Sequence, residues 1–359
     1  MKGLHKKITM QKNVFINIKK RKRITYIDNM KGFAMLCVVL GHIADGYLRS
    51  EYYSSSQEVL YAIYNIIYSF HMPLFIMISG YLYQTAYVEE SGEIKLKKVF
   101  NQIGNLMLIY IEFSFLLGIF KIFCSNYVNT EITWKQLFLI GIKTIAPYWY
   151  IYILIAFYML FSINRISKCS DKILLVSSFL VNLFSGKVDG ACWFEVKRIM
   201  YYLFFWTIGF VYARRKEIFL FNKKIEFLMG AISISLMIVF WNNNKFICQI
   251  PIVNLVVAVG VCLIVWNIFE KHIYMESNNT LIFGKIGKYC LEIYLLHCFF
   301  TAGYRVLFNK CGISNLYISM IFNLVLSIGI SVLIAKLCKK MGIYEVIFKP
   351  FSCISRRKV

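Results

Sequence analysis

The sequence predicts an all-α, polytopic membrane protein with about ten transmembrane helices and both termini in the cytoplasm. Three observations lead to this prediction. Of the 359 residues, 59% are hydrophobic, 17% are aromatic and only 16% are charged, which is not the composition of a soluble domain. The apolar residues form runs long enough to cross a bilayer. The net charge of +23 is concentrated between these runs, which indicates membrane topology rather than nucleic-acid binding.

Ten apolar runs give the expected spans, taken in order along the chain: 24–46, 59–84, 100–123, 148–163, 173–184, 196–212, 225–241, 250–269, 281–302 and 316–336. With the N-terminus inside, the cytoplasmic segments between spans hold 27 of the 41 Lys and Arg, the external segments hold 7, and the other 7 lie within the spans. This bias follows the positive-inside rule. The stretch 124–147 is too short and too broken to span, so we expect an interfacial or re-entrant piece on the outer face.

The domain organisation follows from these spans. Residues 1–23 contain nine Lys or Arg and form a basic cytoplasmic arm near anionic lipid headgroups. Residues 24–338 form the transmembrane domain, and residues 339–359 form a basic cytoplasmic tail. No cleavage site follows the first span, so we expect it to be retained. The eleven cysteines show no paired spacing, so we expect no metal site and no disulfide framework.

The first span carries three ionisable side chains at membrane depth, Asp28, Lys31 and His42. Such groups are costly in hydrocarbon and therefore mark candidate functional sites. Eleven positions separate Lys31 from His42, which places them on nearly the same helix face, roughly 16 Å apart along the axis. An imidazole can take a proton from a hydroxyl and return it, so His42 is a candidate general base.

Further candidates lie in other spans. His71 and His297 are either structural hydrogen-bonding residues or parts of the site. Ser79 and Tyr81 either contribute hydroxyls to a tunnel or, with Gly80, allow close helix packing. Glu292 needs a partner at membrane depth, which makes it a candidate for site support.

Three stretches, spaced over nearly the whole chain, carry a family resemblance. They are the run 26–32 continuing to 38–42, the run 70–75 with 78–81, and the run 284–297. Together they resemble the acyltransferase 3 family of integral membrane O-acyltransferases, and most closely the branch of sugar O-acetylases of the fucose 4-O-acetylase type. The basic residue, ten residues and histidine of the family appear here as Lys31 and His42. Residues 147–151 resemble the family's Trp-Phe-Leu element.

The resemblance implies transfer of an acyl group, usually acetyl, from cytoplasmic acetyl-CoA to a hydroxyl of a cell-surface or lipid-linked carbohydrate at the plasma membrane. Lys31 with Arg214 or Arg215 would hold the CoA phosphates, although the two arginines also fit a purely topological role. His42 would activate the hydroxyl, by direct transfer or through an acyl-enzyme. Asp28 would pair with Lys31 or cap the helix. Trp149 and its aromatic neighbours would stack on a sugar or belong to the interfacial belt.

Two other functions fit the same residues. A transporter or flippase for a lipid-linked sugar would use the intramembrane charges to line its pathway. A non-catalytic membrane sensor would keep the fold without needing His42. The acceptor could be a capsule, lipopolysaccharide, exopolysaccharide, teichoic acid or small glycoside, and the sequence does not choose among them.

Overall fold

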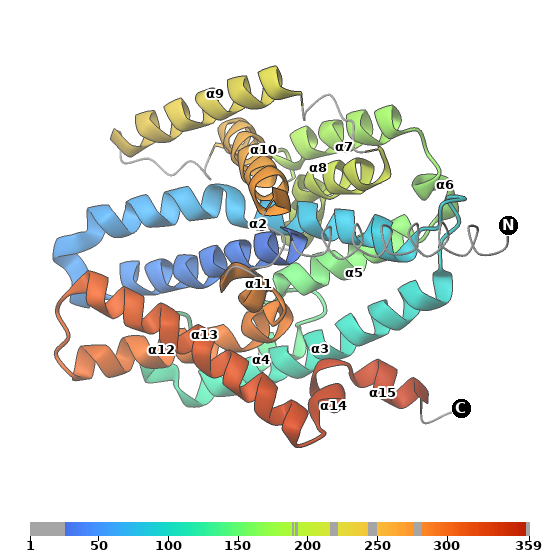
Figure 1. Ribbon diagram of the computed structural model, residues 1–359. Helices are drawn as coiled ribbons and strands as arrows, with labels where there is room; N and C mark the ends of the chain where they lie inside the picture. Colours follow the sequence, from blue (N-terminus) through green and yellow to red (C-terminus); the bar gives the residue numbers. More distant parts are fainter. Residues whose placement is uncertain are drawn as a thin grey trace, which may run out of the picture.

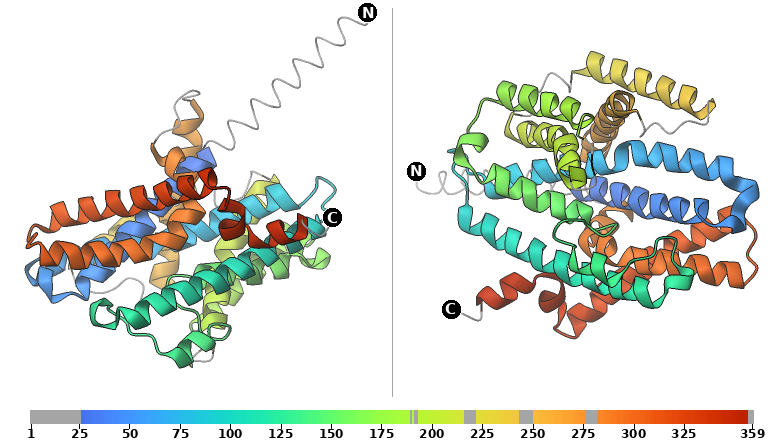
Figure 2. Two further views of the ribbon diagram at one scale, coloured as in Figure 1. Left: turned by 90° about the horizontal axis from the view of Figure 1, so that it is seen from below. Right: turned by 180° about the vertical axis from the view of Figure 1, so that it is seen from behind.

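The protein is a bundle of helices, most of which run side by side along one direction (Figure 1). The computed structural model describes residues 26–188, 190, 193–215, 222–242, 250–275 and 282–356. The predicted basic arm 1–23 lies outside these residues. The views of Figure 2 show the same parallel arrangement from below and from behind. Within the described ranges there is no β-strand, so the predicted all-α class is confirmed.

The helices follow one another with short connections. An N-terminal helix, Tyr26–Leu48, comes first. The remaining helices are η1 (Glu51–Ser56), α2 (Gln57–Tyr87), α3 (Leu96–Phe123), η2 (Ser125–Tyr127), α4 (Trp134–Phe138), α5 (Trp149–Phe161), α6 (Asn164–Ser167), α7 (Asp171–Ser185), α8 (Phe194–Arg215), α9 (Lys223–Asn242), α10 (Pro251–Met275), α11 (Ile282–Gly287), α12 (Cys290–Lys310), α13 (Leu316–Lys340), α14 (Tyr344–Phe348) and α15 (Pro350–Arg356).

Six of the described helices are long and apolar enough to cross a membrane: the N-terminal helix, α2, α3, α10, α12 and α13. The other four predicted spans correspond to α5, α7, α8 and α9. Helices α5 and α7 have 13 and 15 residues, whereas a straight span needs about 20. Charged residues at the ends of α8, and at the start of α9, leave only shorter uncharged stretches. The predicted number of ten spans is therefore not confirmed.

Two predicted segments have a different structure from the one expected. The run 281–302 is not one helix, because α11 ends at Gly287 and α12 begins at Cys290. The tail after Lys340 is not a plain basic extension, because it forms α14 and α15 and packs on α3. There the Asn105 side chain donates a hydrogen bond of 2.7 Å to the Ser352 hydroxyl. The tail thus belongs structurally to the helical domain.

The N-terminal helix lies inside the bundle rather than at its edge. Its apolar side chains Met30, Ala34, Val39 and Ala44 are fully buried. Helix α11 crosses it so closely that the Gly287 backbone meets the Asp28 carbonyl. Because other helices pack around this helix, its polar side chains are kept away from lipid. Ionisable side chains need this shielding, since they are costly in hydrocarbon.

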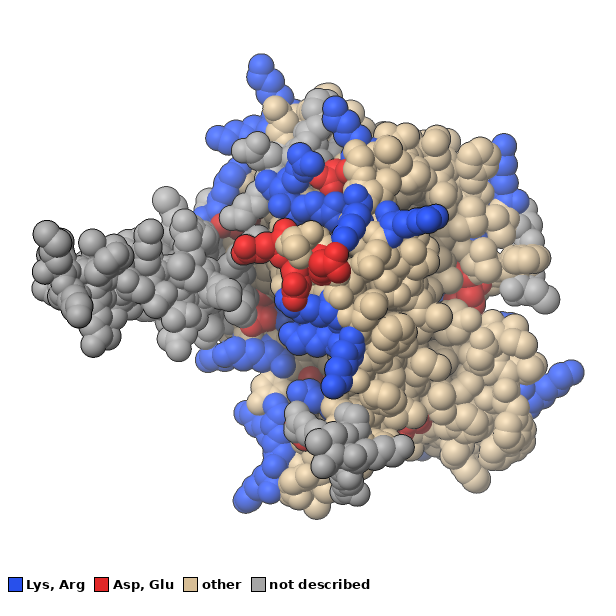
Figure 3. Space-filling view, turned by 90° about the vertical axis from the view of Figure 1, so that its right-hand side faces the viewer, with Lys and Arg blue, Asp and Glu red and all other residues tan. Residues whose placement is uncertain are grey.

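Charge is distributed unevenly over the surface. Figure 3 views the end of the molecule near α6 and the C-terminus, where Lys and Arg gather around a small acidic group. Next to α6, the Lys168 amine forms an ion pair of 2.5 Å with the Glu93 carboxylate. Broad uncharged surface lies beside this charged end, as expected for a bundle whose sides face lipid.

The closest helix contact joins α2 and α8 and depends on glycine. A Cβ atom added at Gly209 would lie 1.8 Å from the Met77 carbonyl oxygen. Gly80 occupies the same interface from the other side, since its Cβ would lie 2.1 Å from the Trp206 carbonyl oxygen. Small residues that let backbones approach are typical of membrane helix packing. Packing is therefore an observed role of Gly80.

Replacing Gly209 by alanine is expected to destabilise the protein by about 1–3 kcal/mol, because a methyl group cannot enter a backbone contact without separating the helices. The matched control is Gly329→Ala in α13, where nothing lies within 4 Å of the added Cβ. Thermal unfolding of the detergent-solubilised variants measures the difference. Equal melting temperatures for the two variants would contradict the close α2–α8 contact.

Candidate functional site

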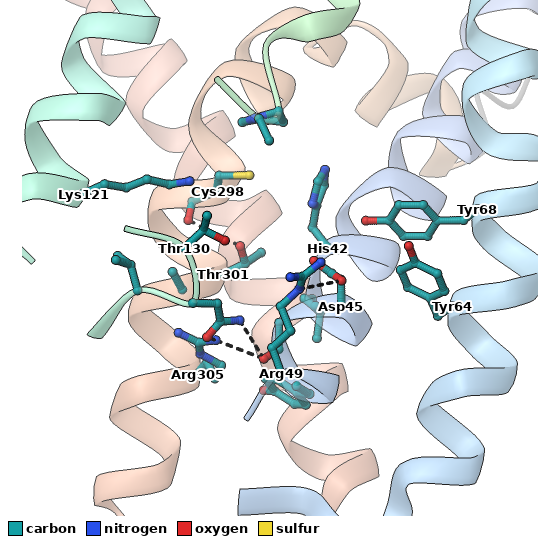
Figure 4. A pocket seen from close by; sticks show the side chains of 18 of the residues that line it. His42, Asp45, Arg49, Tyr64, Tyr68, Lys121, Thr130, Cys298, Thr301 and Arg305 are labelled. Atoms are coloured by element: carbon teal, nitrogen blue, oxygen red, sulfur yellow. Dashed lines mark hydrogen bonds and ion pairs between the residues drawn. The ribbon is translucent and has the colours of Figure 1, made fainter. Parts of the chain in front are cut away.

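His42 lies at the edge of a cavity of about 360 Å³, which we call the His42 cavity. The C-terminal part of the N-terminal helix forms one wall, and α2 and α12 form two others. The loop between α3 and α5 covers it with Asn129, Thr130 and Pro147. This loop is the stretch that the sequence predicts to be interfacial, and its proximity to His42 gives it a place in the site. Figure 4 shows His42 with Tyr64 and Tyr68 on one side and Cys298 and Lys121 on the other.

A second imidazole lies beside the first. The ring centroids of His42 and His297 are 5.1 Å apart. His297 is fully buried, and its Nδ1 lies 2.9 Å from the Ile293 carbonyl oxygen. Because a carbonyl only accepts, Nδ1 carries the proton and Nε2 is left as an acceptor. Nε2 lies 3.3 Å from the Cys298 sulfur. His297 thus lies beside His42 and Cys298 although it lines neither cavity, and its role in the site stays a prediction.

His71 has a different environment. Its Nδ1 lies 2.6 Å from the Ile67 carbonyl oxygen, one turn earlier in α2. The side chain is buried, and its ring contacts Tyr68 at 4.9 Å between centroids. His71 is not among the residues that line the His42 cavity. Its contacts fit the structural alternative, with an indirect link to the site through Tyr68.

Lys31 lines a second cavity of about 400 Å³, which we call the Lys31 cavity. The Lys31 amine lies 2.6 Å from the Asp28 carboxylate, so pairing, one of the two roles predicted for Asp28, is observed. Lys288 lines the same cavity. The first half of the N-terminal helix lines this cavity, and His42 lies in the second half of the same helix. One helix therefore presents a cation to one cavity and an imidazole to the other.

Predicted support residues also line the Lys31 cavity. The Glu292 carboxylate accepts a hydrogen bond of 2.6 Å from the Tyr344 hydroxyl. Burial and this hydrogen bond raise the pKa of Tyr344, so Tyr344 stays a donor at neutral pH. Ser79 contacts the Tyr150 hydroxyl at 2.8 Å, so its hydroxyl faces the cavity while its neighbour Gly80 serves packing.

A thin wall separates the two cavities. Tyr294 lines the Lys31 cavity, and its hydroxyl donates a hydrogen bond to the carbonyl of Pro147, which lines the His42 cavity. Next to it, the Tyr148 hydroxyl donates to the Leu295 carbonyl at 2.6 Å. Tyr294 also contacts His297, with ring centroids 6.1 Å apart. Passage between the cavities requires movement of these aromatic side chains.

Arg214, Arg215 and Tyr81 are predicted site residues that line neither cavity. Arg214 and Arg215 both bind the Asp171 carboxylate at the contact of α8 with α7. Arg214 also donates to backbone carbonyls of that region, which occupies its guanidinium further. Tyr81 lies in the core, with its hydroxyl 3.3 Å from that of Tyr26 and its ring against Trp266. Tyr81 is buried in the core and lines neither cavity, so the structure gives no support to a tunnel role for its hydroxyl.

Trp149 does line the His42 cavity. Its ring stacks on Tyr202 with centroids 5.3 Å apart, and the Arg198 guanidinium lies 4.8 Å above it. Both contacts hold the indole in a fixed orientation. Trp149 thus lines the cavity in a fixed orientation, and its role in binding a sugar stays a prediction.

The structure also places residues in the His42 cavity that the sequence did not single out. Asp45 and Arg49 form an ion pair of 3.0 Å one turn beyond His42, and the Asp45 carboxylate raises the pKa of Arg49. Lys121 and Arg305 enter from α3 and α12. The sequence offered one usable signal, because Asp45 and Arg49 follow His42 at helical spacing. Lys121 and Arg305 carry no such signal.

His42, His297 and Cys298 are also the group of three metal-capable side chains found among the described residues. Their ligand atoms lie within 4.8 Å of one another. Two nitrogens and one sulfur with an open position would suit a soft divalent ion. The expectation that no metal binds stays a prediction.

Comparison with known proteins gives one result. A family model described as an acyltransferase domain matches residues 24–336, which is nearly the entire helical bundle and includes all three resembling stretches. No curated protein and no solved structure matches the chain. The match covers the helix that joins the two cavities and all their lining residues except Tyr344. The chain therefore belongs to the acyltransferase 3 family of membrane acyltransferases and is an enzyme of that class.

Proposed function

We propose that the protein transfers an acetyl group from cytoplasmic acetyl-CoA to a hydroxyl of a cell-surface or lipid-linked carbohydrate. The observation that carries this proposal is the placement of two cavities along one helix, with Lys31 in one and His42 in the other. Such a layout suits a reaction whose two substrates arrive from opposite compartments. The alternative is a transporter or flippase, and the match to an acyltransferase family model favours acyl transfer over it.

The Lys31 cavity suits the donor. Coenzyme A carries phosphates, and Lys31 and Lys288 present two ammonium groups to them as point charges. Apolar side chains such as Met35, Val38 and Leu106 line the remainder of the cavity and suit the less polar arm that bears the thioester. Arg214 and Arg215 have no part in this proposal, since Asp171 already binds both.

The His42 cavity suits the acceptor. Aromatic faces such as Tyr64, Tyr68 and Trp149 can stack on a sugar ring, while Thr130 and Thr301 offer hydroxyls. Carbohydrate sites need such a combination, because a sugar presents both apolar faces and many hydroxyls. His42 projects into the same space (Figure 4). A sugar bound there would lie next to its imidazole.

The chemistry requires the thioester carbonyl to reach His42. The imidazole takes the proton of the acceptor hydroxyl as its oxygen attacks the carbonyl carbon. The new C–O bond forms, the C–S bond breaks, and the imidazolium returns its proton to the departing sulfur to give free CoA thiol. If the imidazole is acylated first, the same bonds form and break in two steps. In either route, Tyr294 and Pro147 separate to admit the thioester.

We also propose ten spans, both termini in the cytoplasm and location in the plasma membrane. Under this topology α5, α7, α8 and α9 complete the bundle despite their shorter apolar stretches. The charged end seen in Figure 3 then faces the cytoplasm, in agreement with the positive-inside rule. The His42 cavity opens to the outside.

Replacing His42 by alanine is expected to lower kcat/KM about 100- to 10,000-fold, which is the usual contribution of a general base. The matched control is His71→Ala, which also removes a buried imidazole but one that lines neither cavity. Acetyl-CoA consumption in the presence of surface glycan measures the rates, and detergent extraction measures correct insertion. Full activity of inserted His42→Ala protein would exclude a catalytic imidazole at this position.

Replacing Lys31 by alanine is expected to raise the KM for acetyl-CoA about 10- to 100-fold, because a charge-assisted contact to phosphate is lost. Lys31→Arg keeps the charge and should recover most of the affinity. Arg215→Ala serves as the control and should leave this KM unchanged. A larger effect of Arg215→Ala than of Lys31→Ala would place the phosphate site at the α7–α8 contact instead.

The proposed topology predicts which free cysteines are reached from outside. Cys311 is exposed in the connection between α12 and α13, which faces outward, whereas Cys353 lies in α15 on the cytoplasmic side. A membrane-impermeant maleimide should label Cys311 in intact cells, and Cys353 only after permeabilisation. Peptide mass spectrometry identifies the labelled residues, and the reverse order would invert the topology.

A further inference from the structure

The His42 cavity holds more positive charge than its own carboxylates neutralise. Four cationic side chains line it, and Asp45 is the single carboxylate among its lining residues. The four cations are Arg49, Lys121, Arg198 and Arg305. A cavity for a neutral sugar needs no such excess, because hydroxyl groups bind equally well to neutral donors and acceptors.

The three arginines are already engaged by the protein. Arg49 pairs with Asp45 at 3.0 Å. Arg198 pairs with Glu195 at 3.2 Å. Arg305 donates to the Gly46 carbonyl at 3.0 Å and to the Tyr127 carbonyl at 2.8 Å. These guanidinium groups therefore shape the cavity and anchor its covering loop.

Lys121 differs from the arginines. Within the part of the chain that the structure describes, its amine has no hydrogen bond and no carboxylate partner. It extends from the last turn of α3 into the cavity above Thr130, with its ammonium end toward Cys298 (Figure 4). The side chain is half-buried. An ammonium group withdrawn from water without a counter-charge is costly, which suggests that a ligand supplies the counter-charge.

We infer that the acceptor carries a carboxylate or a phosphate close to the hydroxyl that is acylated, and that Lys121 binds this anion. The inference rests on the proposed function and names the acceptor's chemical class. Lys121 is thereby a specificity-determining residue rather than a catalytic one. The anion lies near the reacting hydroxyl because Lys121, Cys298 and His42 line the same small cavity.

The donor does not account for this charge. The proposed phosphate site of CoA lies in the Lys31 cavity, which has Lys31 and Lys288 of its own. The Tyr294–Pro147 contact separates that cavity from Lys121. Near His42 the donor presents a thioester, which is uncharged. The anion at Lys121 therefore belongs to the acceptor.

The first test identifies the acylated sugar in cells. Mass spectrometry of surface glycans, with and without the protein, should locate an added acetyl group on a sugar that bears, or directly adjoins, a carboxylate or phosphate. Acetylation of a wholly neutral glycan would overturn the inference but leave the proposed function intact. No acetyl difference, with no acetyl-CoA consumed, would overturn both.

The second test uses the full-length protein in detergent, with de-O-acetylated surface glycan as the acceptor. Lys121→Gln should raise the acceptor KM about 10- to 100-fold, as loss of a charge-assisted hydrogen bond does. The KM for acetyl-CoA and the kcat at saturating acceptor should change little. Lys121→Arg should recover the acceptor KM. Lys143→Gln is the control, because Lys143 is exposed on the same covering loop but does not line the cavity.

Two treatments of the glycan distinguish the sources of the anion. Carbodiimide-mediated reduction converts carboxylates to alcohols, and hydrofluoric acid removes phosphodiesters. The treatment that eliminates the anion should raise the wild-type KM to that of Lys121→Gln and have no further effect on the variant. If neither treatment changes the wild-type KM, or if Lys121→Gln binds the acceptor as wild type does, the inference is wrong.

Discussion

An imidazole and an ammonium group on a membrane helix are energetically costly in contact with lipid, so protein or water must surround them. The rest of the structure depends on this constraint. The N-terminal helix meets it by lying inside the bundle. Its apolar side chains Met30, Ala34, Val39 and Ala44 are fully buried, while Lys31 and His42 each line a cavity of their own. The Asp28 carboxylate compensates the charge of Lys31 at 2.6 Å.

Close backbone contacts make that central position possible. Glycines remove side-chain volume where α11 crosses the N-terminal helix and where α2 meets α8. Without a strong hydrophobic drive between helices in lipid, such close packing supplies much of their attraction. The same contacts decide which faces of α2 point inward. They direct Ser79 to a cavity and Tyr81 to the core.

The division of the interior has a chemical consequence. A thioester is exposed to hydrolysis wherever water meets a general base. The Tyr294 hydroxyl bound to the Pro147 carbonyl lies between the two cavities. In the proposed reaction this contact keeps His42 apart from the Lys31 cavity until it opens. Loop 124–147 forms part of this wall and also covers the His42 cavity. Arg305 anchors the loop through its hydrogen bond to the Tyr127 carbonyl.

Local signals were sufficient for the helical class, the membrane setting and the core of the site. Hydrophobic runs identify spans because a bilayer demands length and apolarity from each helix separately, and the spacing of Lys31 and His42 is a property of one helix. The same reasoning was weaker for α5, α7, α8 and α9, because their uncharged stretches are shorter than a full span.

Contacts between distant segments could be decided only by the tertiary structure. His297 meets His42 across 255 positions of sequence, and Arg214 and Arg215 are bound by Asp171 rather than by the Lys31 cavity. Lys121 looked like one more basic residue near a span end, and only the fold brings it to His42. Sequence spacing specifies neighbours along one helix, whereas the partners of a side chain across helices depend on how backbones pack, and here glycine contacts determine that packing.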